Sequence, residues 1–326
     1  MSGGVTSTNL PTENQDWGFW GHHEAKQFTK AISCGLAHKV SRIATTRSKQ
    51  ETEMTTTVRR SLFALAATMA AGAALPAQAR PLDQVLSSRR LRAGINPTLP
   101  PFGTFNERNQ IDGFDADIAR EIARRMNVEL EIVQVGSPDR IPFLQSDRID
   151  IVLGAITRTI ERALVIDYTQ PLHTQSMVVL TKTSGTAVPI AKPADLNNRQ
   201  VRMVQVRGTV GVPWLQANAA QAQVTLLDNY PDCFRALAQG RADAMVDVAE
   251  SVVIPMRNFQ GVQWKILDEV LASFWVGIGV QKGNTALRDV LNVVLFEMHR
   301  SNFVNQTWEK WFGVPMTTRI PFNPMF

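Results

Sequence analysis

Paired carboxylates and isolated histidines are the side chains of this sequence that most resemble catalytic or metal-binding groups. Asp115 and Asp117 could work as a general acid and base, but both stand where a helix should start, and carboxylates there stabilise the helix dipole. His173 and His299 have no partner at the spacing of a metal site or a catalytic triad. The residues therefore favour no catalytic site, no metal and no cofactor.

Two other residues have side chains or backbone groups suited to an anion. A buried carboxylate is costly unless it is paired, and Arg162 can supply a planar fork of donors for one. Thr209 follows Gly208 and is expected to open a helix, where free N–H groups and the dipole favour an anion. Thr209 could equally serve as a simple N-cap, and one residue can do both.

The elements that must position these residues alternate between strands and helices. Such β-α-β order predicts an α/β protein with largely parallel sheets. Two extended runs bracket the second half of the pattern, so we expect two lobes joined by two crossing strands, with a ligand cleft between them. The expected bounds are 80–177 with 275–326 for lobe 1 and 178–274 for lobe 2. The strands are expected over 91–96, 129–135, 150–154, 176–180, 200–206, 223–227, 244–247 and 274–280, and the main helices over 115–126, 209–219 and 231–239.

Five short motifs, spread in order over nearly all of residues 88–313, resemble one known family. Any one of them alone would be weak. They lie at 113–118, 154–162 (read GAITRTIER), 167–171, 207–209 and 240–244. Together they resemble family 3 of the bacterial extracellular solute-binding proteins, the polar amino-acid receptors of ABC importers. The resemblance implies a type II-like fold of two α/β lobes that close around a small ligand like a hinge.

The resemblance also implies which residues bind the ligand. The family places its carboxylate-binding arginine at the position of Arg162, and a hydroxyl and backbone amide that contact the ligand at the position of Thr157. The full set of predicted ligand-binding residues is Asn96, Leu99, Phe102, Ile156, Thr157, Arg162, Gly208, Thr209 and Asp247.

The first loop departs from the family pattern. Leu99 stands where relatives with amino-acid ligands usually have an aromatic ring, and Asn96 stands where an acidic residue is common. The asparagine disfavours a ligand with a cationic side chain. Phe102 is the best remaining apolar wall for the ligand.

The expected ammonium-binding aspartate is also displaced. The resemblance places it seven residues after Arg241, where Val248 stands, whereas Asp247 is one position earlier. A shift of one residue in a strand normally turns a side chain to the opposite face. Either the strand end is irregular and Asp247 still binds an ammonium, or Glu250 does so, or the ligand lacks that group.

The N-terminal region reads as an export signal. Arg59 and Arg60 precede an apolar stretch over 62–75 and an Ala-x-Ala site ending at Ala79, the pattern of a cleaved signal peptide over residues 54–79. Residues 1–53 are then a non-structural leader, with Met54 as the true start. Removing residues 1–79 leaves 26 basic and 24 acidic residues of the 34 and 29 in the chain, and this balance argues against nucleic-acid binding.

The sequence therefore predicts a monomeric periplasmic receptor that delivers an amino acid or similar small carboxylate to the permease of an ABC importer. One alternative is an enzyme on the same scaffold, like the periplasmic dehydratases that resemble these receptors. That enzyme would need a general acid or base in the cleft, for which Glu250 or His173 could be nominated.

Overall fold

The computed structural model describes residues 80–316 and residue 320. The expected leader over residues 1–53 and the expected signal peptide over residues 54–79 lie outside the described residues. Among the described helices, none is both long enough and apolar enough to span a lipid bilayer.

Lobe 1 contains a five-stranded sheet in the order β4-β1-β5-β13-β6. The strand β1 is parallel to both of its neighbours, whereas β13 is antiparallel to β5 and β6. The carboxyl ends of three strands, β1, β4 and β5, therefore meet at one edge of the sheet. The bounds are β1 Arg90–Ile95, β4 Glu129–Gln134, β5 Ile151–Val152, β6 Ile166–Tyr168 and β13 Gly279–Gln281.

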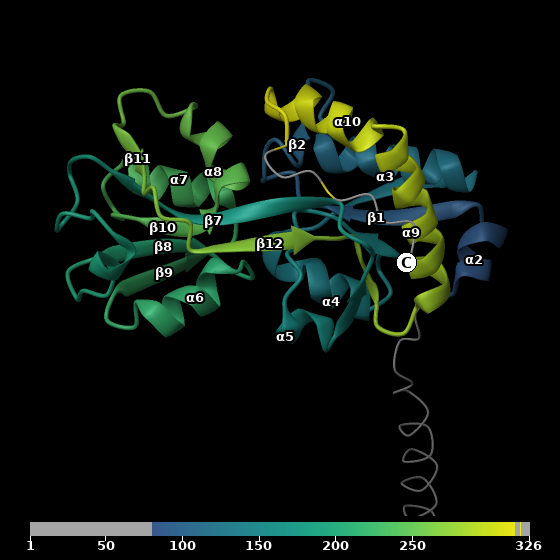
Figure 1. Cartoon of the computed structure of the whole chain (residues 1–326), viewed down its shortest axis with the longest axis horizontal. Coiled ribbons are helices and arrows are strands. Elements are labelled where there is room, and N and C mark those ends of the chain that lie inside the picture. Colours follow the sequence, from purple (N-terminus) through teal and green to yellow (C-terminus); the bar gives the residue numbers. More distant parts are fainter. Residues whose placement is uncertain (1–79, 317–319, 321–326) are drawn as a thin grey trace, which may run out of the picture. The chain divides into compact units, whose positions relative to one another are not determined.

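Both faces of this sheet are covered by helices because its buried strands carry apolar residues on each side. Ile151 and Val152 are neighbours in β5, yet they belong to different core clusters, as the period of two along a strand requires. The helices α3 (Phe114–Met126), α9 (Thr285–Arg300) and α10 (Phe303–Phe312) pack together over one face, and α4 (Arg140–Gln145) packs against β5, β6 and β13 (Figure 1). The short elements of this lobe are α2 (Leu82–Ser87), η1 (Ser137–Asp139), α5 (Ile160–Ala163) and the hairpin of β2 (Thr104–Phe105) and β3 (Ile111–Asp112).

Lobe 2 contains the other sheet strands. The long strand β7 pairs antiparallel with β10 and β11, β8 pairs parallel with β9, and a bridge between Met203 and Ala244 connects the two groups. The bounds are β7 His173–Lys182, β8 Arg202–Val206, β9 Gln223–Leu227, β10 Met245–Val248 and β11 Trp264–Ile266, with η2 Pro193–Leu196, α6 Gly211–Asn218, α7 Tyr230–Ala238 and α8 Ala249–Met256.

Two antiparallel strands connect the lobes. The first half of β7 pairs with β12 (Ala272–Val276), in a register that places His173 opposite Val276 and Met177 opposite Ala272. Figure 1 shows β7 and β12 side by side as they run from one lobe into the other. The predicted two-lobed α/β architecture with two crossing strands is confirmed, and the residues at which each lobe ends stay a prediction.

Candidate functional site

Loops at the carboxyl edge of the lobe 1 sheet approach lobe 2. Ligand sites of open α/β sheets characteristically form at this edge. The loop after β4 passes through η1 and leads to Arg140, and the loop after β5 leads to Thr157. Thr157 is attached to the crossing strand by a bridge to Val276, so one residue of the candidate site is fixed directly to the connection between the lobes.

A small cavity of about 10 Å³ lies between the lobes and has room for about one water molecule. Lobe 1, the crossing strand β7 and lobe 2 all contribute to its lining. The residues are Arg140, Ala155, Thr157 and Arg162 from lobe 1, Gln175 from β7, and Thr209, Val210, Tyr230, Asp247, Val248 and Ser251 from lobe 2.

Arg162 joins the two lobes through its guanidinium group. Its Nη1 atom donates to the carbonyl oxygen of Thr157 at 2.9 Å, and its Nη2 atom donates to the carbonyl oxygen of Gly208 at 2.8 Å. Burial lowers the pKa of Arg162. The predicted carboxylate-binding residue is thus a charged fork of donors in the cavity, and its contact with a ligand stays a prediction.

Arg140 is a second guanidinium in the same cavity, and it was not among the predicted ligand-binding residues. It is 5% exposed, and its Nε, Nη1 and Nη2 atoms donate to the carbonyl oxygens of Ser137, Gly154 and Gly208 at 3.0, 2.5 and 3.1 Å. Burial and the nearby charge of Arg162 lower the pKa of Arg140 to about 10. Both guanidiniums therefore contact one carbonyl group, that of Gly208.

Asp247 lines the cavity despite its displaced position in the sequence. Because β10 ends at Val248 and α8 begins at the next residue, both residues at the strand end reach the cavity. The carboxylate of Asp247 accepts hydrogen bonds from Gln205 Nε2 at 3.2 Å and from the Val248 backbone N–H at 2.7 Å. Burial raises the pKa of Asp247 to about 6. The strand is regular through Val248, so Asp247 reaches the cavity without an irregular strand end, and its contact with an ammonium group stays a prediction.

Glu250 points elsewhere. Its carboxylate accepts a hydrogen bond of 3.2 Å from the backbone N–H of Ser176 on β7, and it is not among the residues that line the cavity. Burial raises the pKa of Glu250 to about 7. The carboxylate of Glu250 therefore contacts the crossing strand β7 and not the cavity.

The two threonines differ in how far the protein satisfies their hydroxyl groups. Thr209 donates to the carbonyl oxygen of Val206 at 2.8 Å and accepts from Gln205 Nε2 at 2.7 Å. Thr157 donates weakly to Gln175 Oε1 at 3.3 Å. The Gln175 Nε2 donor and the Ser251 hydroxyl are buried in the cavity lining with no hydrogen-bond partner in the described structure.

An adjoining groove of about 470 Å³ is lined by Gly208 and Ile156, and Arg140, Arg162 and Thr209 of the cavity line it as well. Gly208 has a φ of +76°, and a Cβ atom built on it would lie 2.9 Å from Pro138 Cα and 2.9 Å from Ser137 O. A glycine is needed here because the backbones of the two lobes approach so closely.

Three predicted residues lie outside both hollows. Asn96 is buried, and its side chain is used within lobe 1, where its Oδ1 atom accepts from Thr98 and its Nδ2 atom donates to Ser137 Oγ at 3.1 Å. Leu99 is buried in the core. Phe102 packs against the rings of Phe114, His173, Trp308 and Phe312. The expectation that Phe102 forms the apolar wall of the ligand is thus not matched by its position, because its ring completes an aromatic core.

Sequence reasoning missed Arg140, Gln175, Tyr230 and Ser251. A usable signal existed for Arg140, since it follows the second strand of a parallel sheet and so should lie at the same edge as the loop after β5. No comparable signal existed for the other three, because their approach to the cavity depends on how the crossing strand β7 and lobe 2 pack.

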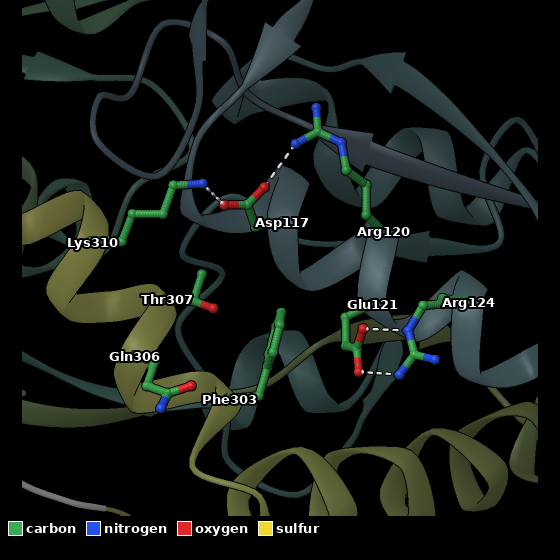
Figure 2. A pocket seen from close by; sticks show the side chains of 8 residues that line it. All are labelled: Asp117, Arg120, Glu121, Arg124, Phe303, Gln306, Thr307 and Lys310. Atoms are coloured by element: carbon green, nitrogen blue, oxygen red, sulfur yellow. Dashed lines mark hydrogen bonds and ion pairs between the residues drawn. The ribbon is translucent and has the colours of Figure 1, made fainter.

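Another hollow, of about 400 Å³, lies on lobe 1 between α3 and α10. Figure 2 shows that its charged side chains already face one another. Asp117 is paired with Arg120 and with Lys310, each at 2.8 Å or less, and Glu121 is paired with Arg124 at 2.8 Å. We therefore place the candidate site between the lobes, where the guanidiniums form no ion pair with a carboxylate of residues 80–316.

The described residues contain no cluster of three or more histidine, cysteine, aspartate or glutamate side chains able to hold a metal. His173 is fully buried among aromatic rings, and burial lowers its pKa to about 4. It is therefore neutral at physiological pH and lies away from the cavity lining.

Comparison with known proteins connects this geometry to one family. The family described as bacterial extracellular solute-binding proteins, family 3, matches residues 91–314. The L-cystine-binding protein TcyJ of Escherichia coli (strain K12) is 26% identical over 236 residues, which are 72% of this chain and 87% of that protein. The ABC transporter arginine-binding protein 1 of the same strain is 27% identical over 229 residues, 69% of this chain and 92% of that protein.

Solved structures of similar fold have comparable coverage. A mutant of ArgBP from T. maritima is 31% identical, with a TM-score of 0.66, over 71% of this chain and 99% of that chain. An ancestral amino acid-binding protein, described as a precursor of cyclohexadienyl dehydratase, is 28% identical, with a TM-score of 0.65, over 71% of this chain and 99% of that chain.

Proposed function

The chain belongs to family 3 of the bacterial extracellular solute-binding proteins, and from this premise we propose that it captures an amino acid or similar small carboxylate between its lobes. The observation that carries the proposal is the position of Arg162. Its guanidinium lies at the cavity between the lobes, and its partners there are neutral: two backbone carbonyls and the Tyr168 side chain. A ligand carboxylate would give this charge the bidentate partner that it lacks.

Hinge closure would couple solute binding to the equilibrium between the open and closed arrangements of the lobes. The lobes are connected by β7 and β12, and Arg162 of lobe 1 reaches Gly208 of lobe 2. A ligand held by residues of both lobes favours the closed state, because an open state offers it only half of those contacts. The closed form then delivers the solute to the permease subunits of an ABC importer.

The proposed location is the periplasm. The signal peptide over residues 54–79, with cleavage after Ala79, remains an expectation from the sequence, and so does a monomeric state. The relatives named above support the transport role, since one of them is named as part of an ABC transporter.

An enzymatic role has weaker support in this structure. The two residues nominated as a general acid or base, Glu250 and His173, are not among the residues that line the cavity. The likeness to a precursor of cyclohexadienyl dehydratase concerns a protein that is itself described as amino acid-binding. We therefore propose binding without catalysis.

A thermal-shift screen of the purified protein against amino acids, keto acids and dicarboxylates tests the proposal. A ligand that binds only the folded protein raises the melting temperature, and we expect at least one compound of these classes to do so. If none of them does, even at millimolar concentration, the proposed function is wrong. Turnover of prephenate or arogenate would establish the enzyme alternative instead.

A further inference from the structure

The charges around the cavity point to the class of solute. The cavity lining contains two guanidinium groups, those of Arg140 and Arg162. Their hydrogen bonds are to backbone carbonyls and, for Arg162, also to the neutral side chain of Tyr168. Neither residue forms an ion pair with any carboxylate in the described part of the chain. By contrast, Arg92 is paired with Asp150 at 2.6 Å and Arg202 with Asp243 at 2.7 Å.

The two unpaired guanidiniums lie close together. The Nη2 atoms of Arg140 and Arg162 donate to the same oxygen, that of Gly208, at 3.1 and 2.8 Å. Like charges at this separation repel, and the repulsion is stronger away from bulk water. The nearby charge of Arg162 accordingly helps to lower the pKa of Arg140.

One carboxylate offsets part of this charge without touching either arginine. The carboxylate of Asp247 forms hydrogen bonds with Gln205, the Val248 backbone and Tyr230. Two cations and one anion leave the lining with a net charge of +1. The cavity of this structure has room for about one water molecule, so the lobes must separate further to admit a solute. A solute with a net charge of −1 would then make the lining neutral.

We propose that the solute is an acidic amino acid, with one carboxylate on each guanidinium and its ammonium group on Asp247. The proposal rests on the proposed function, because it describes the same site. A neutral amino acid would leave one buried guanidinium without a counter-charge, and a basic one would add to the positive excess.

Two buried polar groups without partners also favour a ligand with a second carboxylate. The Nε2 donor of Gln175 and the hydroxyl of Ser251 are buried in the cavity lining and have no partner in the described structure. Buried polar groups of native proteins are nearly always hydrogen-bonded. A second carboxylate supplies acceptors for such donors, whereas an apolar side chain would leave them unsatisfied.

Isothermal titration calorimetry on the purified protein tests the proposal with matched pairs of ligands. The pairs are L-glutamate with L-glutamine and L-aspartate with L-asparagine, with L-arginine and succinate as further probes. We expect at least one acidic amino acid to bind about 100-fold more tightly than its amide, a typical range for a charged partner in a desolvated site. L-arginine should bind more weakly than the amides. Succinate should bind more weakly than the acidic amino acid, because it has no ammonium group to pair with Asp247.

The variant Arg140→Gln tests whether Arg140 is responsible for the preference for the acid over the amide. It should lower the affinity for the acidic amino acid by at least about 30-fold, with a smaller effect on the amide. The matched control is Arg207→Gln, an exposed arginine beside Gly208 that is paired with Asp228 and should change neither affinity. The wild-type comparison of acid and amide does not depend on how well the variant folds.

The outcomes separate this proposal from the proposed function. Tighter binding of an amide, of L-arginine or of succinate overturns the acidic amino acid while the receptor function stands. An unchanged acid preference in a folded Arg140→Gln protein overturns the role of Arg140. If no amino acid or dicarboxylate binds at all, both the proposed function and this inference are wrong.

Discussion

The Nη2 atom of Arg162, in lobe 1, donates a 2.8 Å hydrogen bond to the carbonyl oxygen of Gly208, in lobe 2. A side chain expected to bind the solute is thereby also a contact between the lobes. Gly208 itself approaches lobe 1 so closely that an added Cβ atom would lie 2.9 Å from Pro138 Cα. Binding and closure therefore depend on the same few atoms.

Replacing Gly208 tests whether this close approach is needed for closure. In Gly208→Ala, the methyl group would collide with the backbone of Ser137 and Pro138, which cannot move aside as a flexible side chain could. We expect the solute affinity to fall about 5- to 150-fold, because the collision costs on the order of 1–3 kcal/mol in the closed state only. Calorimetry with the solute found by thermal-shift screening measures the change.

Gly185→Ala is the matched control for this experiment. Gly185 has the same φ of +76°, and an added Cβ atom would meet nothing within 4 Å. Both variants carry a similar backbone strain, but Gly185→Ala should bind the solute as the wild type does. Equal loss of affinity in the two variants would show that strain, rather than contact between the lobes, is responsible.

Asp115 is connected to Arg140, a cavity-lining residue, through the backbone of Gly154. Its Oδ2 atom accepts a 2.8 Å hydrogen bond from the N–H of Gly154, whose carbonyl oxygen in turn accepts from Arg140 at 2.5 Å. Asp115→Ala leaves a buried N–H without a partner, so we expect a loss of about 1–3 kcal/mol in the free energy of unfolding. Asp115→Asn keeps an acceptor oxygen and should lose less. Urea unfolding measures the free energy of unfolding of both variants. An equal loss in both would contradict the role of the hydrogen bond from Gly154 to residue 115.

Glu250 should make stability depend on pH. Burial raises its pKa from the ordinary 4.5 to about 7, so the folded protein favours the uncharged acid. The contribution is complete below the ordinary pKa and disappears as the pH rises through about 7. Glu250→Gln resembles the uncharged acid at every pH, and its melting temperature should therefore match the wild type at pH 4 and exceed it by a few degrees at pH 8.

An exposed glutamate provides the control for this pH dependence. Glu309 lies on the exposed surface of α10, and Glu309→Gln should leave the difference between pH 4 and pH 8 as in the wild type. A Glu250→Gln protein that is less stable than the wild type at pH 8 would show that the charged form of Glu250 is the favoured one.

The sequence predicted the lobes and the crossing strands because these depend on patterns that repeat along the chain. Alternating strands and helices dictate the parallel order of β4, β1 and β5, and the antiparallel β7 and β12 follow from two long extended runs. The family motifs likewise located Thr157, Arg162 and Thr209, which the structure brings together at one cavity. Asp247, which lines the same cavity, is one residue away from the position that the motif indicated.

The remaining site residues depend on tertiary packing that local pattern does not encode. Phe102 was expected to be a wall of the cleft, but His173, Trp308 and Phe312 are distant in sequence and surround its ring. Arg140 looked like one charge among many on a short helix. Only the arrangement of both lobes shows that its acceptors are carbonyls and that it shares one of them with Arg162.

The most direct test of solute capture between the lobes is the thermal shift of Arg162→Ala beside the wild type, with Arg300→Ala as control. Arg300 lies on the exposed surface of α9, where it pairs with Glu297. The account predicts that the solute found by screening raises the melting temperature of the wild type and of Arg300→Ala by several degrees, and leaves that of a folded Arg162→Ala unchanged. An equal rise in Arg162→Ala would contradict the account.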